Sequence, residues 1–547
     1  MLRSKLRWGV RSLAVLAVLA ACGDSAQEPL GPAPDPDPPG EAALARLTAV
    51  QYDNTVRDLF GDELVVPTKL EPDTSIDGLI AIGASQTSIS PRGVEQYETA
   101  SLDIAGQVMD EGPMRDRLVT CTPAAAADDG CAREVLADLG LRAWRRPLTA
   151  AELDTLANIA TSSATTLGDF YDGLELAVGA ILQSPYFLYR IELGEPDPAN
   201  PNRLRYTDYE MASRLSYFLW NTTPDAELLA AAASGELTTD DGLRAHADRL
   251  LASPRARAAL RNFFTDMLEL YRLDDLVKDP TVFTHMSDEV GPSAREETLR
   301  LIDFIVFEQD GDYRDLFTTR RTFVNRKLAS IYNVRAPDRD GFGELTWDTD
   351  APRRGLLTHM SILALHSHPI HSSATLRGKF VRKVLLCGRI PPPPTDVNTA
   401  IPEPSPELPT LRDRVAVHLT NPVCATCHTQ MDPIGLGLEN FDALGRYRVT
   451  ENGVTIDASG ELDGDVYDGP KDLGRAIREH AEVGACLVRT MYRYANGNVE
   501  SPGEAELLAH LDGRFADSRY RVLQLVMDIV MSPGFRLATP AADEGGA

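Results

Sequence analysis

The sequence lacks the motifs that usually mark nucleotide-binding and hydrolytic folds. It contains no G-x-x-x-x-G-K-[ST] phosphate loop, no G-x-G-x-x-G dinucleotide fingerprint and no G-x-S-x-G nucleophile elbow. No segment repeats at a fixed period, and beyond the N-terminus no window is long and apolar enough for a transmembrane helix. Nothing in the chain therefore points to phosphate-loop, dinucleotide-binding or elbow-serine chemistry.

Positive charge is also scarce. The chain has 54 Lys and Arg residues against 81 Asp and Glu residues, a formal net charge of −27. Such a balance argues against nucleic acid and against anionic lipid head groups as partners. It permits attraction towards a basic partner, although a solvated acidic surface is the simpler interpretation.

Strand signals are few, and helical patterns dominate from residue 41 onward. The best strand signal is a hairpin of 446–449 and 454–456 around Asn452-Gly453. We therefore predict a mainly α protein with minor β structure late in the chain. Helices are expected at 41–60, 94–109, 131–144 and 174–189, and a loop is expected at 62–91. Capping signals predict further helix starts at Thr149-x-x-Glu152, Thr207-x-x-Glu210, Ser253-Pro254 and Ser293-x-x-Glu296.

The N-terminus reads as a targeting segment. Basic residues precede a short apolar run at 13–20, and Leu19-Ala20-Ala21-Cys22 closes it. The last four residues resemble the lipobox of bacterial lipoproteins, in which the cysteine is lipidated and becomes the mature N-terminus. The alternative is an ordinary secretory signal with a chance cysteine. We expect a protein anchored by lipid at Cys22 in the bacterial cell envelope, on the periplasmic or outer-surface side.

The strongest chemical signal is the C-x-x-C-H run of Cys424, Cys427 and His428. In an exported protein this pattern predicts covalent attachment of one haem c. One helical turn brings both thiols to the porphyrin edge, and the adjacent histidine becomes the proximal iron ligand. The alternatives are a thioredoxin-type redox pair, which no preceding βαβ pattern supports, and a zinc site that recruits His418 at an unfamiliar spacing.

Several residues are candidates for the sixth iron ligand. Met431 lies only three residues beyond His428 and is expected to be structural. Met491 lies at a suitable distance downstream, and upstream His366 and His371 belong to a histidine-rich stretch that also holds His359 and His368. A filled sixth position favours electron transfer, whereas an open one favours ligand binding or peroxide chemistry.

The other cysteines suggest two disulfides. Setting aside Cys22 and the haem pair leaves four of the seven cysteines, an even number in an oxidising compartment. Three pairings are possible. The simplest joins Cys121 to Cys131 and Cys387 to Cys486, and the second bridge would close the haem region.

An acidic stretch follows the predicted hairpin. Its residues Asp457, Asp463, Asp465 and Asp468 superficially resemble a calcium loop. The order of an EF-hand loop and its terminal glutamate are absent. Turn formation by Asp and Gly is the better interpretation.

Several blocks of the chain resemble one family in their usual order. The segment NPVCATCHTQMDPIGLGLENFDALGRYR (421–448) resembles the planctomycete-type cytochrome c domain of multi-domain exported proteins. Similar matches are RLTAVQYDNTVRDLFG (46–61), RAWRRPLTAAE (142–152), YEMASRLSYFLWNTTPDAELL (209–229), the segment 353–394, VRTMYRYANG (488–497) and SPGFR (532–536). One departure is Asn498, where the family pattern has arginine.

The length alone predicts two to four domains, whereas the blocks predict a longer series of segments. These are a signal peptide (1–22), a Pro-rich tether (23–40), three helical domains (41–112, 130–195, 203–335), a cytochrome c-like domain (350–450) and a C-terminal helical domain (465–537).

The leading functional hypothesis is an envelope cytochrome that passes electrons to or from a partner protein through one haem. A second hypothesis is a haem-dependent oxidase or peroxidase, or an accessory to an envelope degradative enzyme. The third is a non-catalytic envelope scaffold whose haem is structural.

Overall fold

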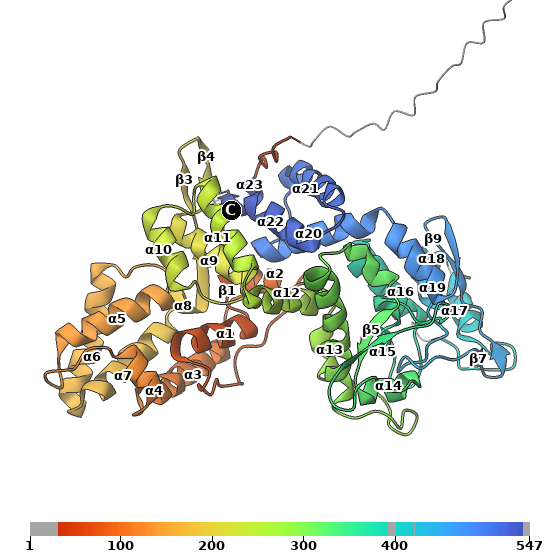
Figure 1. The fold of residues 1–547 in the computed structure, drawn as a ribbon, viewed down its shortest axis with the longest axis horizontal. Helices are drawn as coiled ribbons and strands as arrows, with labels where there is room; N and C mark the ends of the chain where they lie inside the picture. The colour runs from red at the N-terminus through yellow and green to blue at the C-terminus, as the bar shows by residue number, and fades with distance from the viewer. Residues whose placement is uncertain (1–30, 392–400, 421, 540–547) are drawn as a thin grey trace, which may run out of the picture. The chain divides into compact units, whose positions relative to one another are not determined.

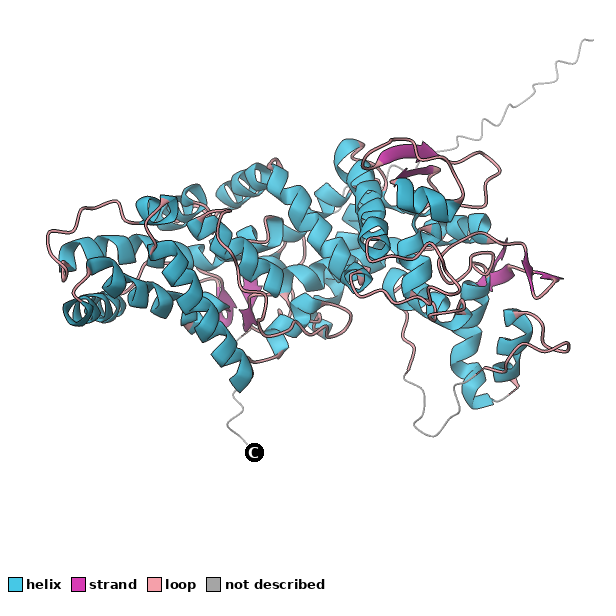
Figure 2. Ribbon diagram, turned by 90° about the horizontal axis from the view of Figure 1, so that it is seen from below, coloured by secondary structure: helices cyan, strands magenta, loops and turns pink. Residues whose placement is uncertain are grey.

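The computed structural model describes residues 31–391, 401–420 and 422–539. The predicted signal peptide and its Cys22 lie outside the described residues. Helices account for most of the described chain, and the strands are short and few (Figures 1 and 2). The predicted mainly α class is therefore confirmed. No helix in the described residues has the length and apolarity needed to cross a membrane.

The first part of the chain is a helical layer in which α3, α5, α6 and α7 pack side by side (Figure 1). Its buried side chains form one hydrophobic core that runs from Leu47 to Tyr217. The helices of this part are α1 (Ala49–Phe60), α2 (Ile80–Gln86), α3 (Pro91–Met109), α4 (Pro113–Leu118), α5 (Asp129–Ala143), α6 (Ala150–Leu167), α7 (Phe170–Gln183) and α8 (Pro185–Leu188).

Most of the remaining helices, together with α2, share a second and larger core, which runs from Leu79 to Ala538. Leu411 and Val415 form a third, small core with Ala374 and Leu436. The central helices are α9 (Asp208–Leu219), α10 (Ala226–Ser234), α11 (Asp240–Leu251), α12 (Pro254–Met267), α13 (Val290–Asp303) and α14 (Arg326–Tyr332). The later helices are α15 (Met360–Leu365), α16 (Ala374–Phe380), α17 (Leu411–Leu419), α18 (Pro422–Leu436), α19 (Pro470–Glu479), α20 (Glu482–Asn496), α21 (Ala505–Asp517), α22 (Val522–Met531) and α23 (Pro533–Arg536).

The strands form small antiparallel sheets between the helices (Figure 2). The pairs are β1–β2, β5–β6, β7–β8 and β9–β10, and β3, β4 and β11 form a three-stranded sheet with β4 in the centre. Their bounds are β1 (Ala43–Arg46), β2 (Tyr189–Glu192), β3 (Glu195–Asp197), β4 (Asn200–Arg205), β5 (Arg321–Val324), β6 (Gly343–Thr346), β7 (Thr450–Glu451), β8 (Val454–Thr455), β9 (Ser459–Leu462), β10 (Asp465–Asp468) and β11 (Leu537–Ala538).

The described residues from Ala33 onward form one compact unit, which contains the five predicted folded domains. The unit starts before the predicted end of the tether at residue 40. Within the tether range, Asp35 forms an ion pair with Arg203, and the Asp37 amide donates to the Gly503 carbonyl at 3.2 Å.

The two ends of the compact unit are joined by backbone hydrogen bonds. The Thr539 amide donates to the Gly40 carbonyl at 2.9 Å, and the Ala42 amide donates to the Thr539 carbonyl at 3.0 Å. Residue 41 and residue 539 therefore form a parallel bridge. The first and last segments of the fold hold each other in place.

The capping signals predicted at three helix starts are confirmed. Thr149 and Glu152 form a reciprocal capping box at the start of α6, and Thr207 and Glu210 form another at α9. Ser253 caps α12 ahead of Pro254. Ser293, in contrast, lies inside α13, which begins at Val290, so this predicted helix start is wrong.

Three other local predictions need correction. Residues 43–46, predicted as helix, form β1 and pair with β2, and α1 starts only after the capping residue Thr48. The predicted loop at 62–91 contains α2. The hairpin around Asn452-Gly453 is present, but its strands are β7 and β8, shorter than predicted and without residues 446–449.

The acidic stretch also forms a hairpin, β9–β10, whose turn is Asp463-Gly464. Both turn residues have positive φ, 51° and 102°, which Asp and Gly tolerate well. The predicted turn is therefore confirmed for Asp463, whereas Asp465 and Asp468 are the end residues of β10. Asp463 also forms an ion pair with Arg382, and its Oδ2 lies 3.0 Å from Nε2 of His480.

Two disulfides are present in the described residues, Cys121–Cys131 and Cys387–Cys486. These are the pairs that cysteine counting selects as the simplest. The second bond spans a sequence separation of 99 residues and joins the segment after α16 to α20. It ties the predicted cytochrome region to the C-terminal helices.

Candidate functional site

The C-x-x-C-H residues lie on one face of α18. Cys424, Cys427 and His428 are spaced three and four residues apart, which places their side chains over successive turns on the same side of a helix. Both thiols are free, and each cysteine is half-buried rather than enclosed. All three residues of the motif thus remain partly exposed on this face.

A carboxylate fixes the orientation of His428. Its Nδ1 lies 2.8 Å from Oδ2 of Asp432, one turn further along α18. A carboxylate only accepts hydrogen bonds, so in a neutral imidazole with this partner Nδ1 is the donor and Nε2 holds the free electron pair. No described residue is hydrogen-bonded to Nε2. The nitrogen that a metal would use is therefore available.

Asp432 is itself held in place from the neighbouring helix. It is buried, and its Oδ1 accepts a hydrogen bond of 2.7 Å from Oγ1 of Thr375 on α16. A chain of two hydrogen bonds thus connects α16 to the imidazole of His428. Such an arrangement restricts both the tautomer and the rotation of the ring.

Two glycines allow α16 and α18 to approach closely. A Cβ atom on Gly378 would lie 1.8 Å from the carbonyl oxygen of Met431, and one on Gly435 would lie 1.8 Å from that of Ala374. Contacts of this length are sterically impossible, so only glycine fits at either position. Met431 is buried at this helix contact, in agreement with the structural role expected for it.

Buried Arg377 fixes the chain that leaves α18. Its guanidinium donates to the carbonyls of Leu438 at 2.9 Å, Phe441 at 2.8 Å and Asp442 at 2.7 Å. Burial lowers the pKa of Arg377 to about 10. The side chain therefore stays protonated at neutral pH and satisfies backbone acceptors that no regular element pairs.

His418 of α17 lies against His428. Their ring centroids are 4.5 Å apart in an edge-to-face arrangement, and Nδ1 of His418 is buried without a hydrogen-bond partner in the described structure. Within the described ranges, no group of three or more His, Cys, Asp or Glu side chains is arranged to hold a metal ion. His418 is thus a neighbour of the site. The sequence indicates this residue only as a possible ligand in the alternative zinc site.

Apolar side chains are exposed on α17 and near the start of α18. Val417 is 40% exposed, Leu419 45% and Val423 55%, although most aliphatic side chains of this protein are buried. A porphyrin is a large apolar plane that needs such a surface. The free thiols, the oriented imidazole and the exposed aliphatic residues together fit a covalently attached haem.

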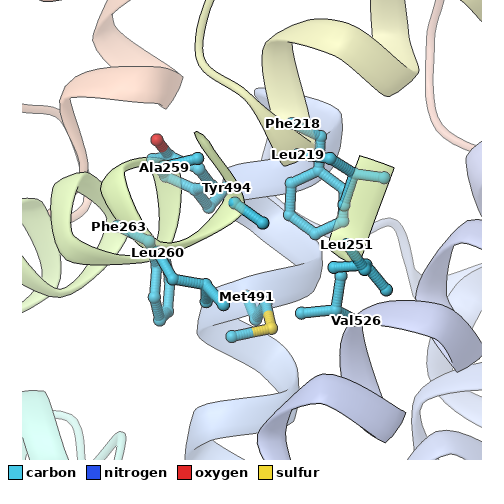
Figure 3. A pocket seen from close by; sticks show the side chains of 10 residues that line it. Phe218, Leu219, Leu251, Ala259, Leu260, Phe263, Met491, Tyr494 and Val526 are labelled. Carbon is cyan, nitrogen blue, oxygen red and sulfur yellow. The ribbon is translucent and has the colours of Figure 1, made fainter. Parts of the chain in front are cut away.

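Met491 lies in the larger hydrophobic core. Its side chain lines a small apolar cavity together with Phe218, Leu260, Phe263 and Val526, residues of α9, α12 and α22 (Figure 3). No residue that lines this cavity belongs to α17 or α18. The contacts that place Met491 are those of an ordinary core methionine.

The two histidine candidates have other neighbours. His366 is buried and stacks on Phe380 with 4.4 Å between ring centroids, and burial lowers its pKa to about 3. The ring of His371 contacts that of His368 at 4.6 Å, and its Nδ1 lies 3.1 Å from the carbonyl oxygen of Ser372. The hydrogen bonds and ring contacts of Met491, His366 and His371 do not involve α18. A role as sixth ligand stays a prediction for each.

Sequence reasoning missed the residues that support His428. The i, i+4 spacing of His428 and Asp432 is visible in the sequence and could have been used. Thr375 and His418 belong to other helices, and no local pattern links them to the C-x-x-C-H run. Their proximity follows only from the packing of α16, α17 and α18.

Five family models match the chain, each described as a protein of unknown function. They are DUF1587 (45–110), DUF1595 (131–192), DUF1592 (206–334), DUF1588 (353–451) and DUF1585 (463–535), and the DUF1588 model bears the short name PSCyt3. No curated protein and no solved structure matches the chain. The five models follow one another without overlap and together cover most of the chain. The protein therefore belongs to the planctomycete-type cytochrome c multi-domain family.

Proposed function

We propose that this protein carries one haem c on α18 and transfers single electrons in the bacterial cell envelope. The observation that carries the proposal is the shared helical face of Cys424, Cys427 and His428, with the imidazole held by Asp432. Half-buried free thiols in a chain whose other described cysteines are paired indicate a separate purpose for this pair.

Each residue has a defined task in this proposal. The two thiols hold the haem as thioethers, and Nε2 of His428 ligates the iron. Bound haem supplies a one-electron redox centre. Asp432 orients the imidazole and makes it a stronger electron donor, and Thr375 keeps Asp432 in place. The exposed aliphatic residues of α17 and α18 exclude water from one side of the group.

The location and partners are part of the same proposal. The basic, apolar and lipobox-like segments that end at Cys22 support lipid anchoring, and c-type haem is attached outside the cytoplasmic membrane. The net charge of −27 favours a partner protein that has a basic surface, and it disfavours nucleic acid as a partner. Mass spectrometry of the mature N-terminus would reveal the acyl chains on Cys22.

A haem-dependent oxidase or peroxidase is the second candidate. It is favoured by the contacts of Met491, His366 and His371, none of which involves α18. An open sixth position would bind carbon monoxide, whereas a position filled by a strong protein ligand would resist it. A scaffold role with a structural haem would give a spectrum insensitive to carbon monoxide and no electron exchange with a partner.

Haem staining on a denaturing gel tests the central claim. Staining should appear in the full-length protein expressed with a cytochrome c maturation system, and it should disappear in Cys424→Ser/Cys427→Ser. The matched control is Cys121→Ser/Cys131→Ser, which removes two cysteines elsewhere and should leave staining intact. Persistent staining after loss of Cys424 and Cys427 would refute the proposal.

Optical spectra then separate the candidate functions. For an electron carrier we expect reversible reduction and a reduced spectrum that carbon monoxide does not change. A shift of the reduced spectrum with carbon monoxide would transfer support to the oxidase or peroxidase. If the haem exchanged electrons with no small redox mediator, the scaffold function would be the one that remains.

A further inference from the structure

A cleft of about 1050 Å³ lies away from the C-x-x-C-H helix. Its walls come from distant parts of the sequence. These are the turn before α2, the end of α12 with the residues after it, the end of α15 with His366, α16 with the segment up to Pro391, and α20 with the residues up to Glu500. Its volume is typical of sites for small organic molecules and far exceeds that of a single ion.

Helical spacing separates this cleft from α18. On α16, Gly378 packs against the backbone of α18, whereas Leu376, Lys379 and Phe380 line the cleft. At 100° per residue, Leu376 and Phe380 lie about 160° from Gly378, on the opposite side of α16, and Lys379 lies about 100° from it. A ligand in the cleft would therefore be divided from the thiols of α18 by the body of α16.

The walls of the cleft are basic in an acidic protein. Six Lys or Arg residues line it against three acidic residues, whereas the whole chain has a net charge of −27. The basic residues are Arg272, Lys379, Lys383, Arg389, Arg489 and Arg493, and the acidic ones are Asp77, Glu269 and Glu500.

The acidic residues neutralise only part of this charge. Arg272 pairs with Glu269, and both Arg489 and Arg493 pair with Glu500. Within the described structure, Lys379, Lys383 and Arg389 have no ion pair or hydrogen bond. Three cations that face one cavity without acidic partners repel one another, and an anion between them would relieve this repulsion.

A buried imidazole provides a second, independent observation. His366 lines the cleft, is 8% exposed, and its Nε2 has no hydrogen-bond partner among the described residues. Buried polar atoms are nearly always paired, so an unpaired one requires an explanation. A neutral imidazole nitrogen in such a wall can donate to an anionic oxygen or accept from a hydroxyl group of a ligand.

The remaining walls are apolar, and this narrows the class of ligand. Leu79, Met267, Leu376, Phe380 and Val384 contribute side chains to the same cleft. A free inorganic ion would leave these surfaces in contact with water. A molecule with an apolar or aromatic frame and several anionic groups satisfies both kinds of wall.

We propose that this cleft is a binding site for a small organic polyanion, a molecule with two or more carboxylate, sulfate or phosphate groups on an apolar frame. Lys379, Lys383 and Arg389 hold the anionic groups, His366 donates or accepts one hydrogen bond, and Phe380 and Met267 contact the frame. The site does not depend on haem at α18.

Fluorescence anisotropy with pyranine, a fluorescent aromatic trisulfonate, tests the proposal on the full-length protein. We expect saturable binding that weakens as the salt concentration rises. Benzene tricarboxylate should displace the probe at concentrations at least tenfold lower than inorganic phosphate. Equal displacement by inorganic phosphate would show a site for simple anions and would overturn the organic part of the proposal.

Matched variants locate the binding. Lys379→Gln/Lys383→Gln should weaken pyranine binding at least tenfold. The control Lys69→Gln/Lys471→Gln removes the same charge from exposed lysines outside the cleft and should change affinity less than twofold. Equal losses in the two variants would mean that pyranine responds only to net charge, and the cleft would not be its site.

His366→Phe tests the imidazole while keeping an aromatic ring against Phe380. We expect weaker pyranine binding, with an unchanged midpoint of thermal unfolding as evidence that the variant folds normally. The same binding measured in Cys424→Ser/Cys427→Ser should be unchanged, which separates this proposal from the proposed haem function. An unchanged affinity in His366→Phe would remove the imidazole from the site, and absence of saturable binding to the unaltered protein would refute the site itself.

Discussion

Nδ1 of His428 donates a hydrogen bond to Oδ2 of Asp432 at 2.8 Å, across one turn of α18. A carboxylate in this position gives the imidazole partial imidazolate character, which stabilises the oxidised state of a ligated iron. If the proposed haem is attached at α18, Asp432 is the residue that tunes its potential.

Asp432→Asn should raise the midpoint potential while leaving haem attached. The amide oxygen can still accept from Nδ1, but the negative charge is lost. We expect a shift on the order of 60 mV, because ~1.4 kcal/mol corresponds to that change for one electron. A spectroelectrochemical titration measures it. Thr375→Val should shift the potential less in the same direction, and exposed Asp465→Asn should not shift it. A lowered or unchanged potential in Asp432→Asn would contradict the assigned role.

Gly378→Ala should destabilise the protein, because the new Cβ would collide with the carbonyl oxygen of Met431. Overpacking of this kind costs about 1–3 kcal/mol or more. The matched control is Gly106→Ala in the interior of α3, where the nearest atom is 3.7 Å away. Alanine there should stabilise by roughly 0.5–1 kcal/mol. Opposite changes in the midpoint of thermal unfolding are expected, and a neutral Gly378→Ala would show that the two helices separate easily.

Loss of the two disulfides should have unequal effects. In the chain-entropy model a loop of 99 residues contributes about 4.7 kcal/mol and one of 10 residues about 2.7 kcal/mol. Cys387→Ser/Cys486→Ser should therefore lower stability more than Cys121→Ser/Cys131→Ser. Denaturant unfolding of the two double variants gives the comparison. A larger loss from the Cys121–Cys131 pair would indicate that local packing, and not loop length, determines the effect.

The free energy of unfolding should fall as the pH rises and the buried carboxyl group of Asp266 ionises. Burial raises the pKa of this carboxyl from 3.8 to about 7, although the backbone amides of Ile80 and Ala81 act in the opposite direction. The folded protein therefore binds a proton that the unfolded chain releases, so ionisation between about pH 4 and pH 7 costs on the order of a few kcal/mol. Asp266→Asn should flatten this part of the profile of unfolding midpoint against pH. A profile that keeps its slope in the variant would assign it to other groups.

Local chemistry explains most of what the sequence predicts correctly. Thr149 with Glu152 and Asn452 with Gly453 determine their own geometry, because each pair of groups lies within one turn of the chain. The pairing of β1 with β2 could not be predicted in this way. Its partners Ala43 and Glu192 are distant in sequence, and the apolar residues of β1 also fit a helical period.

The residues of the candidate site also differ in whether local sequence can predict them. Cys424, Cys427 and His428 form a contiguous motif whose chemistry depends on spacing alone. Thr375, His418 and the basic cleft depend on how α16, α17 and α20 pack, and packing is set by the sum of many contacts. Met491 shows how sequence position alone can mislead. Its place in the sequence suits a distal ligand, but its apolar neighbours place it in the core.

The bridge between residues 41 and 539 has a mechanical consequence. Any pull on the chain ahead of Gly40, such as a lipid anchor would exert, reaches the backbone hydrogen bonds to Thr539 before it reaches α1. The load then passes into β11, at the other end of the chain, and from there into β4, so that it is spread over a three-stranded sheet. The fold is thereby protected from being peeled open helix by helix from its N-terminal end.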